Sequence, residues 1–242
     1  MCSSDLYLGA PKLDRIDRPV IKDSATRLNK FKVAELDILT LERKDVPGAQ
    51  RDPALKAQMQ PQPRPAVFYI GLNQTNSPAL KNRHLRRAIA MAIDRTRIAH
   101  DLLGGMPEAH GLVSPGVFGY RENYKGLPFD PVAAKRELIE AGYPNGKGVP
   151  PIDLTYREQS GDSQVVCEAV QQQLKQYLGL SINVRPMMWS ALLQARNENK
   201  LEMYFLSWYA DYLDPQNFLS FLFMSNAKLN HDLYRSSEFD RL

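Results

Sequence analysis

The 242-residue sequence predicts an α/β fold with mainly parallel strands. Short apolar segments alternate along the chain with segments whose apolar residues recur at i, i+3, i+4 and i+7, the spacing of an amphipathic helix. In the second half, the strand–helix–strand units have the length that crossovers between parallel strands need. The composition, 43% hydrophobic and 24% charged, is that of an ordinary globular protein and argues against a disordered or collagen-like chain.

The first third of the chain is expected to contain one helix, two short extended segments and one buried strand. The helix should begin at Asp23 or Ser24, whose side chains are of the type that caps helices. Residues 43–66 hold five prolines, so we expect a long connection there. The extended segments are 13–21, where Pro19 favours an edge position, and 36–41; the buried strand is 67–72.

Capping residues predict most helices of the second half. Asn82 and Asp94 each precede an apolar helical pattern, and Asp130-Pro131 places a capping side chain before a proline at the first helical position. Residues 106–129 carry Gly and Pro every few positions and predict a loop. The other expected elements are strands at 152–156, 180–184 and 201–207 and helices at 164–178, 189–196 and 215–223.

The positive charge is concentrated in one short region. The net charge is +4, and residues 68–100 alone hold six Lys or Arg against one acidic residue. We interpret the basic stretch 81–97 as a solvated helix face, because it contains no aromatic side chain that could stack on a base. A nucleic-acid-binding module is therefore the weaker alternative, and no nucleic-acid partner is predicted.

The two cysteines allow at most one disulfide. Cys167 lies in a helical apolar pattern and is expected to act as a small hydrophobic residue, and Cys2 lies at the terminus. No apolar run reaches the roughly 18 residues that a membrane-spanning helix needs, and residues 1–20 lack the apolar core of a secretory signal. Residues 1–6 follow no structural pattern and are expected to be a non-native tail.

The usual enzyme motifs are missing from the sequence. There is no phosphate-binding loop, no dinucleotide-binding glycine motif and no nucleophile elbow, and the four histidines lack the spacing of zinc ligands. Asp211 and Asp214 have no nucleophile or third orienting group beside them. We therefore predict no catalytic residue, no metal and no cofactor, and keep an α/β enzyme with an unrecognised site as an alternative.

One stretch, residues 203–223, contains eight of the 22 aromatic residues. Trp208, Tyr209 and Tyr212 come just after a predicted strand and alternate with Asp211. In open α/β sheets ligands bind outside the carboxyl ends of strands, and aromatic walls with one fixed charge suit such a site. The alternative is a simple core role, which is expected for the phenylalanines of this stretch, Phe205, Phe218, Phe221 and Phe223.

Several motifs, taken in series, resemble those of the family 5 extracellular solute-binding proteins, the peptide- and nickel-binding receptors of ABC importers. They are residues 68–73 (Phe-Tyr-Ile-Gly-Leu-Asn), 86–94 (Arg-Arg-Ala-Ile-Ala-Met-Ala-Ile-Asp), 102–105 (Leu-Leu-Gly-Gly), 130–144, 208–215 (Trp-Tyr-Ala-Asp-Tyr-Leu-Asp-Pro) and 237–240 (Ser-Glu-Phe-Asp).

The resemblance implies an incomplete type 2 periplasmic-binding-protein fold with two α/β lobes. Residues 7–67 would form part of the first lobe, 68–75 a strand crossing the hinge, and 76–242 the second lobe, truncated at its C-terminus. The protein would be a periplasmic or membrane-anchored extracellular monomer whose signal sequence is missing from this stretch. It would close around a peptide and present it to the permease subunits of an ABC importer.

The resemblance also implies a set of ligand-binding residues. Asp211 matches an aspartate that holds a peptide's α-amino group, Trp208 and Trp189 match tryptophans that line side-chain pockets, and Tyr209 is expected beside them. Arg196 matches an arginine near the peptide's carboxyl end, with a plain surface role as its alternative.

The chain departs from the family pattern at three places. Phe205 and Ser163 replace an arginine and a histidine that some peptide-binding members use, and Ala34 replaces a common glycine. A nickel chelate or an oligosaccharide therefore remains an alternative ligand.

Overall fold

The computed structural model describes residues 12–62 and 64–241. These fall into two compact units, Met1–Gln62 and Pro63–Leu242. The predicted tail at residues 1–6 and Cys2 lie outside the described residues. The expected lobe boundaries, with a hinge-crossing strand at 68–75, remain a prediction.

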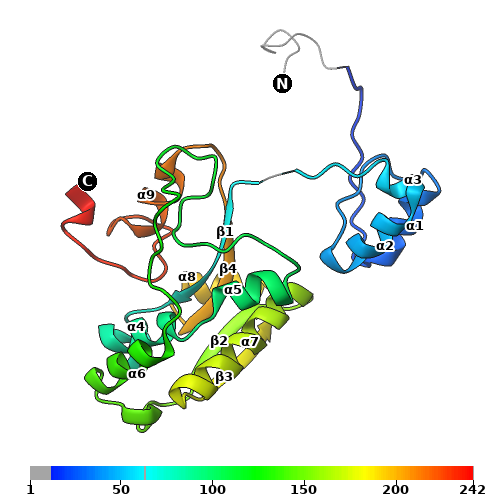
Figure 1. The fold of residues 1–242 in the computed structure, drawn as a ribbon. Coiled ribbons are helices and arrows are strands. Elements are labelled where there is room, and N and C mark those ends of the chain that lie inside the picture. The colour runs from blue at the N-terminus through cyan, green and yellow to red at the C-terminus, as the bar shows by residue number, and fades with distance from the viewer. Residues whose placement is uncertain (1–11, 63, 242) are drawn as a thin grey trace. The chain divides into compact units, whose positions relative to one another are not determined.

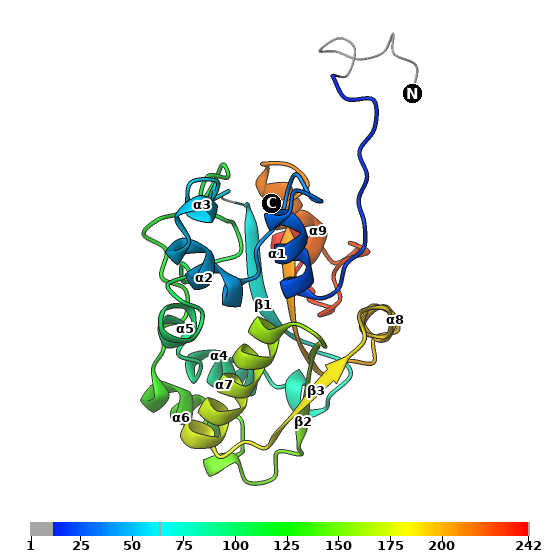
Figure 2. The ribbon, with the colours of Figure 1, turned by 90° about the vertical axis from the view of Figure 1, so that its right-hand side faces the viewer.

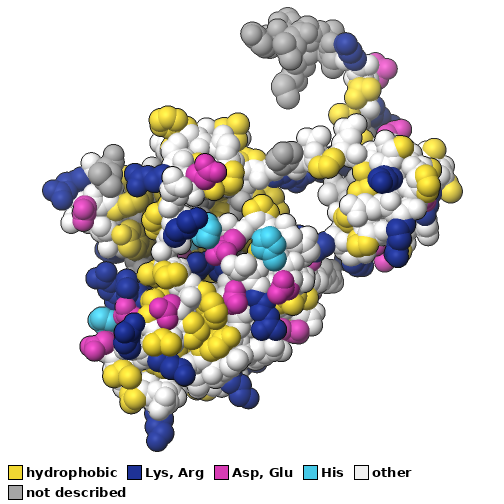
Figure 3. Space-filling model, in the orientation of Figure 1, with side chains coloured by type: hydrophobic (Ala, Val, Ile, Leu, Met, Phe, Trp, Pro, Cys, Tyr) yellow, Lys and Arg dark blue, Asp and Glu magenta, His cyan; other side chains and the backbone are white. Residues whose placement is uncertain are grey.

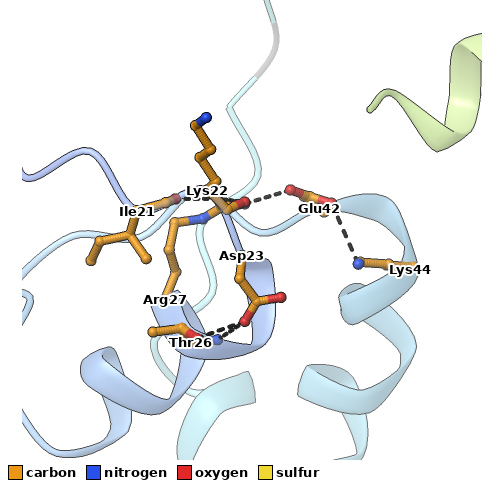
Figure 4. A network of polar contacts seen from close by, with 7 residues as sticks. All are labelled: Ile21, Lys22, Asp23, Thr26, Arg27, Glu42 and Lys44. Carbon is orange, nitrogen blue, oxygen red and sulfur yellow. Dashed lines mark hydrogen bonds and ion pairs between the residues drawn. The ribbon is translucent and has the colours of Figure 1, made fainter. Parts of the chain in front are cut away.

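The first unit is built from short helices. As predicted, the first helix begins beside Asp23, whose Oδ1 accepts hydrogen bonds from the Thr26 amide at 2.7 Å and the Thr26 hydroxyl at 2.6 Å. Arg27 ties this start to the incoming chain by donating to the Ile21 carbonyl at 2.7 Å, and it pairs with Glu42 (Figure 4). The helices are α1 (Ser24–Lys32), the 3₁₀ turn η2 (Arg43–Asp45), α2 (Val46–Arg51) and α3 (Pro53–Lys56).

Two predictions for this unit are wrong. No strand forms at 36–41, and Ile38 is 87% exposed there, because residues 12–62 contain no partner strand to complete a ladder. Residues 43–66 are not a plain connection, because they hold α2 and α3. Asp52 caps α3 and Pro53 occupies its first turn, the same signal that marks residues 130–131.

The second unit contains a four-stranded sheet in the order β1-β4-β2-β3 (Figure 1). Its strands are β1 (Ala66–Leu72), β2 (Ile152–Arg157), β3 (Ile182–Met187) and β4 (Met203–Tyr209). β2 runs parallel to β3 and β4, as the α/β prediction requires, whereas β1 pairs antiparallel with β4. β1, β2 and β4 lie within two residues of their predicted positions at both ends, and β3 ends three residues later than predicted.

One face of the sheet carries the main hydrophobic core. It is covered by α4 (Arg83–Met91), α6 (Pro131–Glu140) and α7 (Gly161–Leu178), which Figure 2 shows on the side of the sheet opposite α8. The fully buried residues of this core include Leu85, Ile89, Leu138, Leu154, Cys167 and Leu174.

Local signals set the ends of these helices. Asn82 accepts from the amides of His84 and Leu85, and Asp130 accepts from those of Val132 and Ala133. Gly179, in the left-handed region at φ 70°, ends α7.

The other face is covered more thinly. α8 (Trp189–Asn197) packs there through Leu192, next to Tyr204 and Leu206. Val117 from the long loop and Phe218 form a second small cluster with Val67. The remaining elements are α5 (Arg95–Arg97) with the π-helical turn Ile98–Leu102, α9 (Ser220–Phe223), and the 3₁₀ turns Ala79–Lys81, Pro144–Gly146, Pro215–Asn217 and Phe239–Arg241.

Gly71 is essential to the packing of this second face. The ring of Tyr204 crosses β1 at Gly71, where a Cβ atom would lie 2.3 Å from Cζ of the tyrosine. Tyr204 thereby reaches Asp232, to whose Oδ1 its hydroxyl donates at 2.9 Å. Burial is the largest influence on the Asp232 carboxyl and raises its pKa above the ordinary value.

Two further expectations can be judged. The single helix predicted over 215–223 is instead the 3₁₀ turn Pro215–Asn217 followed by α9, and Phe221 is 38% exposed rather than part of the core. Within the basic stretch, Lys81 and Arg83 are exposed as predicted, while Arg87 and His84 both bond Glu137 on α6. Figure 3 shows charged side chains of both signs interspersed on the face in view.

Candidate functional site

The parallel strands β2, β3 and β4 end at one edge of the sheet, which we call the carboxyl edge. Arg157 ends β2, Trp189 follows β3, and Trp208 is the second-last residue of β4. Thr155 pairs with Tyr204, so the alternate positions further along, Arg157 and Trp208, lie on the same face as these two. The register therefore places a cationic and an aromatic side chain on one face at this edge.

Asn217 connects Trp208 to Asp211. Its Oδ1 accepts from Nε1 of Trp208 at 2.9 Å and from the backbone amide of Asp211 at 3.3 Å. Asn217 has no exposed surface, so the loop between β4 and α9 is fixed from inside. The Asp211 side chain remains exposed and forms no ion pair within residues 64–241. Asp214 instead caps the turn at 215–217 by accepting from the Gln216 amide.

Arg157 and Trp189 form a second pair at this edge. The guanidinium carbon of Arg157 lies 5.4 Å from the centre of the Trp189 ring, within the range of a cation–π contact. Arg157 is exposed and has no carboxylate partner among residues 64–241. Stacking holds the guanidinium plane while its hydrogen-bond donors stay available for a ligand.

Two more exposed aromatic side chains lie at the end of β4 and in the loop that follows it. Tyr209 is 47% exposed and meets Phe68 edge to face with ring centres 6.1 Å apart, on the sheet face opposite Trp208. Tyr212 packs in the same manner on Phe221, with centres 6.3 Å apart. Neighbouring exposed aromatic side chains of this kind are typical of ligand-binding or protein-interaction surfaces.

Arg196 lies elsewhere. It is seven residues along α8 from Trp189, which is roughly 10 Å along the helix axis. It lines a cavity of about 410 Å³ together with residues of 227–233. The structure thus brings Asp211, Trp208 and Trp189 to one edge, sets Tyr209 on the other face, and separates Arg196. The binding roles of all five remain predictions.

The sequence analysis missed Arg157 and Asn217. Arg157 could have been found, because it ends a predicted strand just as Asp211 follows one. Asn217 gives no such signal, since one asparagine within a predicted helix does not reveal that it is buried.

Two absences hold for the residues that the structure describes. No group of three or more His, Cys, Asp or Glu is arranged to hold a metal ion there. In that same part of the chain, no helix is both long enough and apolar enough to cross a bilayer.

Comparison with known proteins gives one consistent family. A family model described as bacterial extracellular solute-binding proteins, family 5 Middle, matches residues 4–230. Heme-binding protein A of Haemophilus influenzae is 28% identical over 241 residues, covering 98% of this chain and 43% of that protein. A probable di/tripeptide-binding protein of Pseudomonas aeruginosa is 27% identical over 222 residues, covering 89% of this chain and 40% of that protein.

A solved structure agrees with these matches. The crystal structure of a periplasmic oligopeptide-binding protein from Borrelia burgdorferi is similar with a TM-score of 0.76 and 26% identity, over 92% of this chain and 44% of that one. The chain therefore spans less than half the length of the relatives that it matches.

Proposed function

We propose that this chain, which belongs to the bacterial extracellular solute-binding proteins of family 5, binds a short peptide and delivers it to an ABC importer. The ligand would be held between two lobes that close about a hinge outside the cytoplasmic membrane. Closure requires contacts that the ligand makes only in the closed state, since equal contact with both states shifts no equilibrium. The function is binding and release, with no reaction.

The observation that carries this proposal is a pair of opposite, unpaired charges at the carboxyl edge. Arg157 ends β2, and Asp211 follows the neighbouring strand β4 by two residues. In the register of the sheet Arg157 lies level with Leu206, five residues before Asp211, so up to roughly 16 Å of chain separates the two backbones, and the long Arg157 side chain can span part of it. A free peptide of a few residues carries an ammonium and a carboxylate at its two ends and matches this arrangement of opposite charges.

Each predicted residue then has a specific role. Asp211 accepts hydrogen bonds from the α-ammonium, a charge-assisted contact about twice as strong as a neutral one. Arg157, stacked on Trp189, offers two parallel donors to the carboxylate. Trp208 supplies apolar surface on the α8 face and Tyr209 supplies it on the opposite face at the end of the same strand. The Arg196 role at the carboxyl end is kept as the competing prediction.

Peptides with one end blocked test the proposal. Trp189 and Trp208 are the only two tryptophans of the chain, so intrinsic fluorescence reports on the carboxyl edge. The 242-residue chain is titrated with Ala-Phe, N-acetyl-Ala-Phe and Ala-Phe amide. We expect each blocked peptide to bind at least about tenfold more weakly, because one charge-assisted contact with the peptide is lost.

Two variants assign the ends. Asp211→Asn should abolish the preference for a free amino end only, and Arg157→Gln the preference for a free carboxylate only. Arg136→Gln, an exposed arginine on α6, is the matched control and should behave as wild type. Equal binding of all three peptides would overturn the roles of both charges. Binding of hemin or a nickel–histidine chelate with no response to any peptide would replace the peptide by a non-peptide ligand.

A further inference from the structure

A small cavity lies beside β1, the strand at one end of the sheet. It has a volume of about 210 Å³, which is room for roughly seven water molecules. Pockets for drug-sized ligands usually measure about 300–1,000 Å³, so this one suits only a small molecule. Its walls come from β1, α4, α9 and the loop after α9, and they include Ile70, Leu72, Arg86, Phe223, Asp232 and Tyr234.

This cavity is distant from the carboxyl edge. β1 runs antiparallel to β4, and Leu72 is level with Met203 at the beginning of β4. Trp208 lies five residues further along that strand, which is roughly 17 Å at the strand rise per residue. A ligand of the size of one amino acid therefore does not reach both places.

Arg86 brings a positive charge with free donors to the cavity. Its Nη1 donates to the carbonyls of Leu80 at 2.7 Å and Lys81 at 3.0 Å, which holds the guanidinium in place. Within residues 64–241, Arg86 forms no ion pair, and its Nε and Nη2 donate no hydrogen bond. Neither of these two nitrogens is a buried unpartnered atom, so both are open to a ligand.

Asp232 brings a negative charge to the same cavity. Its carboxyl accepts from the Tyr204 hydroxyl at 2.9 Å and from the Leu72 amide, so its position is fixed. Both donors are neutral, and Asp232 forms no ion pair within residues 64–241. An ionised carboxyl offers about four lone-pair sites and can accept a further donor. Burial raises the pKa of this carboxyl, and a bound cation would stabilise its ionised form.

Apolar side chains form the other walls. Ile70 and Leu72 pack against the main core, and Phe223 meets Tyr234 edge to face with ring centres 6.1 Å apart. Asn230 fixes Tyr234, because it accepts from the tyrosine amide at 3.0 Å and donates to its carbonyl at 2.7 Å. The walls are therefore in place before a ligand enters, which lowers the ordering cost of binding.

We propose that this cavity is a second ligand site, which binds a single free α-amino acid with a small apolar side chain. Its carboxylate accepts from the free donors of Arg86, and its ammonium donates to Asp232. Its side chain lies against the apolar walls. A zwitterion fits better than a simple anion or cation, because either of those would leave one of the two charges unpaired. The site does not depend on the peptide site proposed at the carboxyl edge.

Titration of the 242-residue chain with L-valine, followed by ¹H–¹⁵N NMR, tests the proposal. N-acetylvaline lacks the ammonium and valinamide lacks the carboxylate, and both are titrated in parallel at constant ionic strength. We expect valine to give saturable shifts confined to residues 70–74, 86 and 223–234. Each blocked compound should bind at least about tenfold more weakly, since it loses one charge-assisted contact.

Two variants assign the two charges. Asp232→Asn keeps the shape of the side chain and should abolish only the preference for valine over N-acetylvaline. Arg86→Gln should abolish only the preference for valine over valinamide. Arg136→Gln serves again as the matched control and should bind valine as wild type does. Because Arg86 also bonds two carbonyls, a well-dispersed spectrum must confirm that Arg86→Gln is folded; if it is not, the Asp232→Asn result decides alone.

Three results would overturn the proposal. Shifts that stay linear with valine concentration would mean that there is no specific site. Equal binding of sodium acetate and valine would reduce the cavity to an anion site on Arg86. Valine shifts at Trp189 and Trp208 that Ala-Phe abolishes would place valine in the peptide site. Loss of Ala-Phe binding in Asp211→Asn has no bearing on valine, so the two proposals fail separately.

Discussion

The two faces of the sheet differ in the interactions that stabilise their packing. The face under α4, α6 and α7 is one continuous apolar core that runs from Leu80 to Phe205. The face under α8 has two small apolar clusters together with buried polar contacts, such as Tyr204 to Asp232 and Trp208 to Asn217. Apolar burial dominates folding free energy, whereas buried polar groups fix geometry. The first face therefore stabilises the unit, and the second carries most of the candidate binding groups, with Tyr209 as the exception.

Among the variants that test this difference between the two faces, Leu154→Ala on the core face should have the largest effect on stability. Leu154 has no exposed surface and lies in β2 among the helices. Removing its side chain should lower the free energy of unfolding by about 3 kcal/mol, through lost burial and a cavity. Urea unfolding followed by circular dichroism measures this, with Leu213→Ala, 64% exposed, as a control that should change little. A loss below about 1 kcal/mol would contradict the importance of this face.

A second test adds one carbon to the other face. Gly71→Ala would place its Cβ 2.3 Å from the Tyr204 ring and displace that ring from Asp232. We expect a loss of about 2 kcal/mol, the usual cost of overpacking. Gly161→Ala is the matched control, because no atom lies within 4 Å of the added carbon. Equal stability of the two variants would show that Tyr204 has room to move.

The smallest expected effect depends on pH. Burial first, and then the charge of Arg196, lower the pKa of His231 to about 4, whereas an unfolded histidine titrates near 6.5. Between these values the unfolded chain binds a proton that the folded chain does not, so stability falls as the pH drops from 6.5 toward 4. Because His231 is partly open to solvent, screening reduces this loss of folding stability to about 1 kcal/mol.

The His231→Gln variant isolates this contribution. Wild type should lose more stability than the variant between pH 7 and pH 4.5, when urea midpoints are compared at both values. The raised pKa of Asp232 acts in the opposite direction, but it is present in both proteins and cancels in the comparison. Parallel pH curves for the two proteins would contradict the prediction.

The sequence predicted the elements whose signals are local. Asn82 and Asp130 cap helices where expected, and the β2, β3 and β4 segments are strands in the expected order. Residues 36–41 have a strand-like pattern, but pairing depends on a neighbour that no local pattern reveals. The antiparallel pairing of β1 with β4 is nonlocal in the same way.

The candidate site also has features that local sequence patterns predict and features that only the tertiary structure reveals. Trp208 and Asp211 could be placed at a ligand site because ligands bind where strands end. Two contacts could be identified only from the strand register and the packing of α8 in the structure. They are the hydrogen bonds of Trp208 and Asp211 to the same Asn217 oxygen, and the stacking of Arg157 on Trp189. The separation of Arg196 from this edge follows from the direction of α8, which the helix pattern alone does not give.

The strand order β1-β4-β2-β3 has a consequence for how the chain is made. β1 is synthesised before α4, but among the described residues its neighbour in the sheet is β4 alone, which follows α8. Until β4 emerges from the ribosome, β1 has both backbone edges free, and such edges pair readily with other chains. Contacts this distant in sequence also form slowly. The nascent chain therefore passes through a long interval in which a chaperone that shields β1 would raise the yield of folded protein.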